Sequence, residues 1–287
     1  MRFVAFKKGG EARLGVNTDK GLVDLSLVDK TIPKDLKALL AQGKGAVAKA
    51  GRAAKKAPAS AIVKGKVSYL PPVQAPGKIL CIGLNYKDHA AEAGLKIPTF
   101  PVVFARFPNS IVGNGQAIVR PKVSKHFDYE AELVAVIGKK ARNVKKSEAL
   151  DYVAGYTVGN EGSIRDYQMK TSQWIMGKSV DQTGSMGPEF VTADELPKGG
   201  KGLAIKCRLN GKTLQDSNTK EMIFDTQTLI YEIAKVITLE PGDCIFTGTP
   251  AGVGFVMKPP VLMKGGDVCE IEIENIGILT NPVKNEK

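Results

Sequence analysis

The sequence lacks several features that would assign it to a specialised class. In its 287 residues no unbroken apolar stretch approaches the roughly 20 residues that span a bilayer, so we expect neither a membrane helix nor a membrane partner. Its start lacks the apolar core and cleavage site of a secretory signal, and we therefore expect a cytoplasmic protein. The four cysteines are far apart, with no CxxC pair or Cys/His cluster, which favours buried, reduced thiols.

Aromatic residues are scarce at 6%, and none lies in the most basic part of the chain, between Lys30 and Lys66. Ten basic residues and a single acid, Asp35, give this segment nine of the +12 net charges. Because it has no aromatic side chain to stack on a base and no nucleic-acid motif, we expect a solvated helical face or a flexible arm, and no nucleic-acid partner.

The order of short strands and helices indicates two unequal domains. Residues 1–72 are expected to form a small α+β domain, with strands over RFVAFKK, ARLGVNT and GLVDLS before the basic helical segment. The proline-rich stretch YLPPVQAPGK, residues 69–78, interrupts any helix and marks the boundary. Residues 73–287 hold many strands that do not alternate regularly with helices, which predicts an α+β architecture of mixed β-structure rather than a doubly wound parallel sheet.

Three carboxylates alternate along FDYEAEL, at Asp128, Glu130 and Glu132, just before the apolar run Leu133-Val134-Ala135-Val136-Ile137. In a strand they would lie on one side and repel one another. A divalent cation would offset that repulsion, and oxygen ligands select a hard ion such as Mg²⁺, Mn²⁺ or Ca²⁺. The alternative is a solvated strand face paired with lysines, although the apolar continuation favours an internal strand.

Two further segments carry candidate site residues. His89 and Glu92 are spaced i, i+3 on a predicted helix, which indicates either a water-activating general base or a surface ion pair. The glycine loop TGTPAGVG, residues 247–254, follows a predicted strand and lacks a nucleotide-binding fingerprint. Its backbone N–H groups and the Thr249 hydroxyl could form a cradle for a carboxylate.

Seven segments in order, between about residues 77 and 283, resemble the fumarylacetoacetate hydrolase family. They are KILCIGLNYKDHAAEAG, FPNSIVGNG, DYEAELVAVIGKKARNV, AGYTVGNEGSIRDYQ, GKSVDQTGSMGP, LQDSNTKEMIF and LEPGDCIFTGTPAGVG. The resemblance implies a twisted mixed β-roll core, usually in a homodimer, with one divalent cation beneath a 2-oxo acid or acylpyruvate. The leading residues also resemble the small N-terminal domain that many members carry.

The resemblance assigns roles by position. Glu130 and Glu132 match the family's Glu-x-Glu metal ligands, and Glu161 stands where the family has a third ligand, an aspartate. The longer side chain adds about 1.5 Å of reach. The family positions that hold the substrate's carboxylate and oxo groups are matched by Arg165, Gln168, Lys178 and Thr249. The family's dyad on a lid segment is matched by His89 and Glu92.

The activity that the resemblance implies is a divalent-metal-dependent cleavage of a C–C bond in an acylpyruvate or related 2,4-dioxo acid. His89, oriented by Glu92, would take a proton from the attacking water, and Lys178 would stabilise the oxyanion. The same site could instead decarboxylate or tautomerise oxaloacetate, or hydrate or isomerise an unsaturated 2-oxo diacid. A third alternative is a non-catalytic binding protein in which the change to Glu161 has cost the chemistry.

Overall fold

The computed structural model describes residues 1–287 and begins with a three-stranded meander. Strands β1 (Arg2–Lys8), β2 (Glu11–Thr18) and β3 (Gly21–Asp24) pair antiparallel, close to the predicted ranges. The turn between the first two is Gly9-Gly10, with φ of 60° and 85°, a conformation that glycine adopts at little cost.

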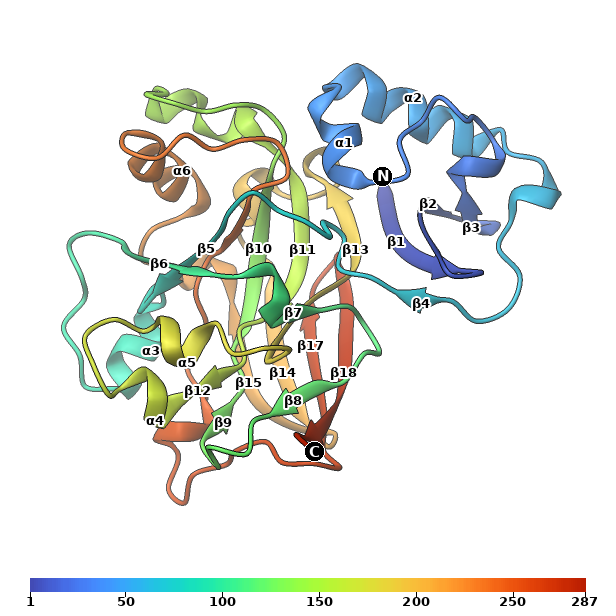
Figure 1. The fold of residues 1–287 in the computed structure, drawn as a ribbon. Helices are drawn as coiled ribbons and strands as arrows, with labels where there is room; N and C mark the ends of the chain where they lie inside the picture. The colour runs from blue at the N-terminus through green and yellow to red at the C-terminus, as the bar shows by residue number, and fades with distance from the viewer.

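Two helices cover this meander (Figure 1), α1 (Leu36–Ala41) and α2 (Lys44–Lys55). The Asp35 side chain caps α1 by accepting a hydrogen bond from the backbone N–H of Ala38 at 2.9 Å. The inward face of α2 consists of small residues, and a Cβ added at Gly51 would lie only 1.8 Å from the Met1 Sδ atom. The helix therefore packs closely, and its basic side chains face the solvent.

The strands of the chain, including β1, β2 and β3, form three sheets. The largest has eleven strands in the order β3-β2-β1-β13-β11-β10-β16-β5-β6, with β4 beside β1 and β7 beside β13. A second sheet follows the order β15-β14-β17-β18-β8, and β12 pairs with β9. The other strands are β4 (Ser68–Tyr69), β5 (Ile79–Gly83), β6 (Val102–Arg106), β7 (Ile111–Val112), β8 (Ile118–Arg120), β9 (Phe127–Asp128), β10 (Ala131–Ile137), β11 (Val153–Asn160), β12 (Ser163–Ile164), β13 (Gly184–Thr192), β14 (Ala204–Leu209), β15 (Lys212–Asn218), β16 (Cys244–Phe246), β17 (Val268–Ile273) and β18 (Gly277–Asn285).

The main core lies between the two larger sheets, where β10 and β11 pack against β14, β17 and β18 (Figure 1). Every residue of β10 is buried, because the strand is flanked on both sides and its apolar run fills the space between the layers. Four short helices lie around this core: α3 (Lys87–Glu92), α4 (Arg165–Gln168), α5 (Ile175–Lys178) and α6 (Thr226–Ala234). The predicted α+β class with mixed β-structure is confirmed.

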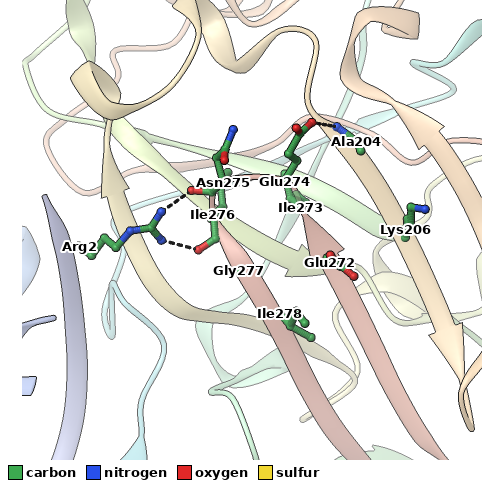
Figure 2. Close-up of a pocket in the computed structure, with 10 residues that line it drawn as sticks. All are labelled: Arg2, Ala204, Lys206, Glu272, Ile273, Glu274, Asn275, Ile276, Gly277 and Ile278. Atoms are coloured by element: carbon green, nitrogen blue, oxygen red, sulfur yellow. Dashed lines mark hydrogen bonds between the residues drawn. The ribbon is translucent and has the colours of Figure 1, made fainter. Parts of the chain in front are cut away.

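The N-terminal strands continue the main sheet, since β1 pairs with β13 at Arg2 opposite Val191 and Phe3 opposite Phe190. Figure 2 shows the Arg2 guanidinium at the turn between β17 and β18, where it donates to the carbonyl oxygens of Asn275 at 2.6 Å and Ile276 at 2.9 Å. Backbone pairing thus crosses the boundary expected near residue 72, and the division into domains 1–72 and 73–287 stays a prediction.

Two further expectations concern cysteines and membranes. All four cysteines are buried and free, as predicted. None of the helices is both long enough and apolar enough to cross a membrane.

Candidate metal centre and active site

The three glutamates come together where β10 begins and β11 ends. Antiparallel pairing sets Glu132 opposite Gly159 and Ala131 opposite Asn160, and the backbone N–H of Glu161 donates to the carbonyl oxygen of Glu130 at 2.9 Å. One carboxylate oxygen from each of Glu130, Glu132 and Glu161 lies within 4.8 Å of the others, and all three side chains are buried. The Glu161 side chain, which is longer than an aspartate, therefore lies together with Glu130 and Glu132. These three glutamates are called the acidic group below.

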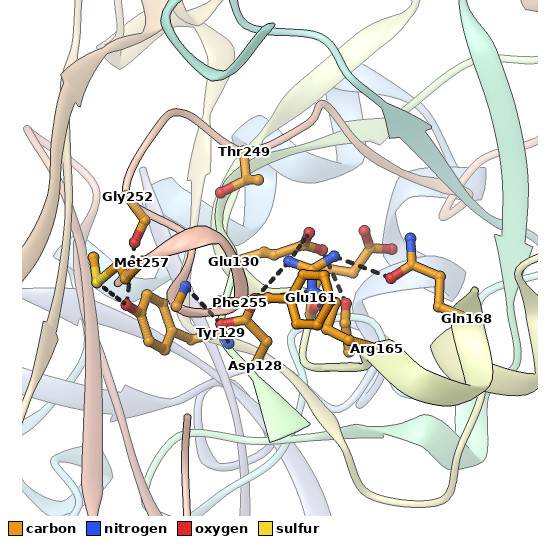
Figure 3. A network of polar contacts seen from close by, with 12 residues as sticks. Asp128, Tyr129, Glu130, Glu161, Arg165, Gln168, Thr249, Gly252, Phe255 and Met257 are labelled. Carbon is orange, nitrogen blue, oxygen red and sulfur yellow. Dashed lines mark hydrogen bonds and ion pairs between the residues drawn. The ribbon is translucent and has the colours of Figure 1, made fainter. Parts of the chain in front are cut away.

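Two cations contact this acidic group, and Figure 3 shows one of them, Arg165. The Lys178 ammonium lies 2.5 Å from a Glu130 oxygen and 2.9 Å from a Glu161 oxygen. The Arg165 guanidinium bridges Glu130 and Asp128, with 2.8 Å to each. Together with Asp128, the three glutamates make four buried carboxylates against two contacting cations. This region therefore carries surplus negative charge when all four carboxylates are ionised.

The surplus of negative charge affects the pKa values of the three glutamates. Burial raises the pKa of Glu130, but the charges of Arg165 and Lys178 outweigh burial and hold that pKa below its usual value. Burial, followed by the charges of Glu161 and Glu130, raises the pKa of Glu132 well above its usual value. Burial also raises the pKa of Glu161, against the opposing charge of Lys178. A further positive charge beside Glu132 and Glu161 would therefore lower both pKa values.

The donor set fits a hard divalent cation. All three candidate ligands are carboxylates, which Mg²⁺ and Mn²⁺ prefer over softer donors. In addition, the buried Oε1 atom of Glu161 has no hydrogen-bond partner, although buried carboxylate oxygens rarely go unpaired. A cation held by Glu130, Glu132 and Glu161 would neutralise the surplus charge and give that oxygen a partner. Metal binding remains a prediction for these residues.

Asp128 has a separate place. It ends β9, outside the continuous strand β10, and its carboxylate accepts hydrogen bonds from Arg165 Nε and from the backbone N–H of Gly254, both at 2.8 Å. Arg165 Nη1 also donates to Gln168 Oε1 at 3.0 Å. The alternating carboxylates therefore do not share one exposed strand face: Asp128 positions Arg165, while Glu130 and Glu132 belong to the acidic group.

The glycine loop closes over Glu132. The backbone N–H of Gly248 donates to Glu132 Oε2 at 2.7 Å. Gly248 has a φ of 98°, and a Cβ there would lie 2.7 Å from the Asn85 Cβ, so both the conformation and the space favour glycine. Thr249 follows directly, is 6% exposed, and extends toward the acidic group in Figure 3.

The predicted dyad is attached to the same loop. His89 Nδ1 lies 3.5 Å from Glu92 Oε2, and both Glu92 oxygens accept from the backbone N–H of Gly252, at 3.0 and 3.1 Å. The Tyr129 hydroxyl donates to the Gly252 carbonyl at 3.1 Å. The short helix α3 thus contacts the loop that carries Thr249. The roles of His89 and Glu92 stay predictions.

Sequence reasoning missed two buried residues of this region. The Ser163 hydroxyl donates to Glu130 Oε2 at 3.0 Å. Gln215, on β15 of the second sheet, contacts both the start of β10 and the glycine loop. Ser163 meets Glu130 because β12 pairs with β9, and Gln215 reaches the site because the second sheet packs on the first; no spacing or composition signal predicts either contact.

Comparison with known proteins gives a consistent picture. The sequence profile described as Fumarylacetoacetate (FAA) hydrolase C-terminal matches residues 78–284. The chain is 45% identical to the fumarylacetoacetate hydrolase domain-containing protein 2 homolog of Dictyostelium discoideum, over 95% of this chain and 92% of that protein. It is 41% identical to the oxaloacetate tautomerase fahd2, mitochondrial, of Xenopus laevis, over 99% of this chain and 90% of that protein.

Solved structures agree with the fold. A fumarylacetoacetate hydrolase from Exiguobacterium antarcticum superposes with a TM-score of 0.86 at 34% identity, and both chains are fully covered. The maleylpyruvate hydrolase from Sphingobium.sp SYK-6 gives a TM-score of 0.80 at 28% identity, again with full coverage of both chains. The expectation of a cytoplasmic protein is wrong, because it conflicts with the mitochondrial location named for similar proteins of Xenopus laevis and Homo sapiens.

Proposed function

This chain belongs to the fumarylacetoacetate hydrolase family, and we propose that it is a divalent-metal-dependent enzyme that interconverts the keto and enol forms of oxaloacetate or a similar 2-oxo diacid. The observation that carries the proposal is the buried Glu130, Glu132 and Glu161 group with Lys178 and Arg165 against it. The names of similar proteins, including the Xenopus laevis tautomerase, favour this reaction over the C–C hydrolysis expected first.

The acidic group supports a hard divalent ion and indicates what it would do. Mg²⁺ or Mn²⁺ held by Glu130, Glu132 and Glu161 would polarise the 2-oxo group and favour loss of a proton from the neighbouring carbon. The choice of a dicarboxylate substrate follows from the surrounding donors. Arg165, Gln168 and the Thr249 hydroxyl offer hydrogen bonds to carboxylate oxygens, since Arg165 Nη1 keeps one N–H beyond the one that it donates to Gln168.

Tautomerisation requires one proton to leave C3 and one to arrive at the C2 oxygen. As the C3–H bond breaks, its electron pair forms the C2=C3 double bond and negative charge develops on the C2 oxygen. The Lys178 ammonium, which is buried with the acidic group, would stabilise that charge and can donate a proton to the oxygen. The reaction is balanced without water or any co-reactant.

His89 is the proposed base at C3. Its Nδ1 faces Glu92, which leaves Nε2 as the nitrogen that can accept a proton from the substrate. Glu92 itself accepts from the backbone N–H of Gly252, so the carboxylate that His89 Nδ1 faces at 3.5 Å is attached to the loop that carries Thr249. The attachment of Glu92 to this loop supports a base and a carboxylate-binding group that act on the same substrate.

The same dyad supports a second candidate, hydrolysis of an acylpyruvate. In that reaction His89 takes a proton from water, the resulting hydroxide adds to the 4-oxo carbon, and the C3–C4 bond breaks to give a carboxylic acid and pyruvate. The structural similarity to a maleylpyruvate hydrolase favours this alternative. A homodimer and a small-molecule 2-oxo acid partner remain part of the proposal.

The test follows the enol form of oxaloacetate by its ultraviolet absorbance, with Mg²⁺ or Mn²⁺, and pyruvate release from acylpyruvates in parallel. We expect the wild-type protein to accelerate the tautomerisation beyond the rate with free metal ion. His89→Ala should lower that rate by about 10² to 10⁴. His126→Ala, which changes the other histidine, half-exposed near Asp166, is the matched control and should leave the rate unchanged.

Each outcome distinguishes the candidates. Acylpyruvate cleavage without tautomerisation would favour the hydrolase. An unchanged rate in His89→Ala would remove His89 from the mechanism. A protein that accelerates neither reaction would be better described by the non-catalytic alternative.

A further inference from the structure

Gln215 is an unusual residue for its position. It lies on β15, the edge strand of the second sheet, and is the only buried side chain of that strand. An apolar residue is the usual choice at a single inward position, because a buried amide must find partners for all of its polar atoms. At Gln215 the partners lie in two other parts of the molecule.

Three hydrogen bonds of 2.9 Å connect the Gln215 amide to the site. Its Oε1 accepts from the backbone N–H of Ala131, the residue between Glu130 and Glu132. Its Nε2 donates both to the Thr249 hydroxyl oxygen and to the Pro250 carbonyl oxygen. The glycine loop is therefore joined to the start of β10 through this one side chain.

The loop also packs on the strand beside Gln215. Gly252 has a φ of 95°, and a Cβ there would lie 2.1 Å from the Leu214 carbonyl oxygen and 3.2 Å from the Gln215 Cα. The loop backbone thus rests directly on β15. Its position relative to Gln215 is set by this close contact as well as by the hydrogen bonds.

The chemistry of the partners fixes which way the amide points. The Ala131 N–H can only donate and the Pro250 carbonyl can only accept, so Oε1 must face Ala131 and Nε2 must face the loop. The Thr249 oxygen therefore receives a hydrogen bond from Gln215. Because the amide donates, the Thr249 hydroxyl hydrogen cannot point toward Gln215 and is left to donate elsewhere.

We propose that Gln215 is a positioning residue that holds the Thr249 hydroxyl as a hydrogen-bond donor toward the substrate carboxylate. The inference rests on the proposed function, in which Thr249 binds a 2-oxo acid. Gln215 does not touch the substrate; it acts through Thr249. Without the amide the hydroxyl is free to rotate and its proton no longer has a preferred direction.

The test is a double-mutant cycle on Gln215 and Thr249, with oxalate as the probe for the 2-oxo-carboxylate unit. Oxalate affinity is measured by calorimetry with Mg²⁺ present, and the melting temperature is measured for each variant. Thr249→Val should weaken oxalate binding by about 10- to 100-fold, whereas Thr249→Ser, which keeps the hydroxyl, should stay within about threefold. Gln215→Met, which is neutral and of similar length, should weaken binding in the wild-type background only.

The two readouts separate positioning from simple support of the fold. Gln215→Met leaves the Ala131 N–H and the Pro250 carbonyl unpaired, so the melting temperature should fall in both the wild-type and the Thr249→Val backgrounds, and further in the wild type because the Gln215–Thr249 bond is lost as well. The loss of oxalate affinity, in contrast, should disappear in the Thr249→Val background. Should Gln215→Met not fold, Gln215→Asn, which shortens the amide by one carbon, takes its place in the same cycle.

Two results would overturn the inference. Equal losses of oxalate affinity in both backgrounds would show that Gln215 only supports the loop, and no loss in either would show that it has no influence on the site. In both cases wild-type binding of oxalate would leave the proposed function intact. A wild-type protein that neither binds oxalate nor turns over a 2-oxo acid would overturn the proposed function and this inference together.

Discussion

The basic N-terminal segment and the acidic site both carry a surplus of one charge, but they handle it in opposite ways. Between Lys30 and Lys66 the surplus lies on solvated side chains, and even the paired Lys49, 2.9 Å from Asp29, is 55% exposed. At the acidic site Glu130, Glu132 and Glu161 are each less than 5% exposed. Water screens the first surplus at little cost, whereas the second requires cations placed by the fold.

Removing one cation from each region is the strongest test of this difference. The Arg165 guanidinium lies 2.8 Å from both Asp128 and Glu130 and offsets their negative charge. Arg165→Met removes this cation and leaves both carboxylates buried. We expect the free energy of unfolding to fall by about 3–5 kcal/mol, measured by urea denaturation. Arg52→Met, on the exposed face of α2, is the matched control and should change it by less than about 0.5 kcal/mol. Similar losses in the two variants would contradict the comparison.

Shortening an acidic side chain at the site should have a smaller effect. Glu161→Asp should lower Mn²⁺ affinity by about 10- to 100-fold, because the carboxylate withdraws from Glu130 and Glu132. The backbone cannot follow it: the Glu161 N–H is bonded to the Glu130 carbonyl, and a Cβ at Gly162 would lie 1.9 Å from the Thr183 carbonyl oxygen. Affinity is measured by calorimetry. Equal or tighter binding by the aspartate variant would show that chain length at this position does not set the geometry.

The smallest effect is expected at the basic surface. Replacing Lys55 and Lys56 together by glutamine removes two charges from exposed positions at the end of α2. The free energy of unfolding should change by less than about 0.5 kcal/mol, and the turnover of oxaloacetate should be unaffected. A change in either quantity would mean that this surface is coupled to the site, and the contrast between the two regions would not hold.

The same contrast separates what the sequence could predict from what it could not. The buried strand β10 and its glutamates are recognisable, because a five-residue apolar run directly follows FDYEAEL. The short strands β1, β2 and β3 follow their residue patterns and glycine turns. The continuation of these strands into the main sheet could not be predicted, since it depends on pairing between β1 and β13, where Arg2 lies opposite Val191, far away in the sequence.

Contacts between the two larger sheets could not be predicted from the sequence either. Gln215 reads as an ordinary polar residue of an edge strand, and only packing places it against Ala131 and Thr249. Glu161 could be matched by position to a metal ligand of the family. Whether its carboxylate would lie beside Glu130 and Glu132 depended on the backbone geometry at Gly162, which the spacing of residues does not predict. The local sequence pattern predicts helices and strands. The hydrogen-bond partners of buried polar atoms can be identified only once the fold is assembled.

The acidic site also predicts how stability depends on pH. Because the folded-state pKa of Glu132 is raised above its unfolded value, the protonated form favours folding below the unfolded pKa, and this contribution is lost as the pH rises through the folded pKa. A bound cation replaces the lost proton. The increase in melting temperature caused by Mg²⁺, measured over a series of pH values, should therefore become larger as the pH rises through the folded-state pKa of Glu132.

The most direct test of a cation in the acidic site is the melting temperature of wild-type protein and Glu132→Gln, each with a chelator and with Mg²⁺. The glutamine keeps an oxygen for the Gly248 N–H but carries no charge. We predict that Mg²⁺ at about a hundredfold excess over its Kd raises the wild-type value by about 5 °C and leaves the variant unchanged. With chelator the variant should melt higher than wild type. No shift in wild type, together with a lower melting temperature for Glu132→Gln in chelator, would contradict the account.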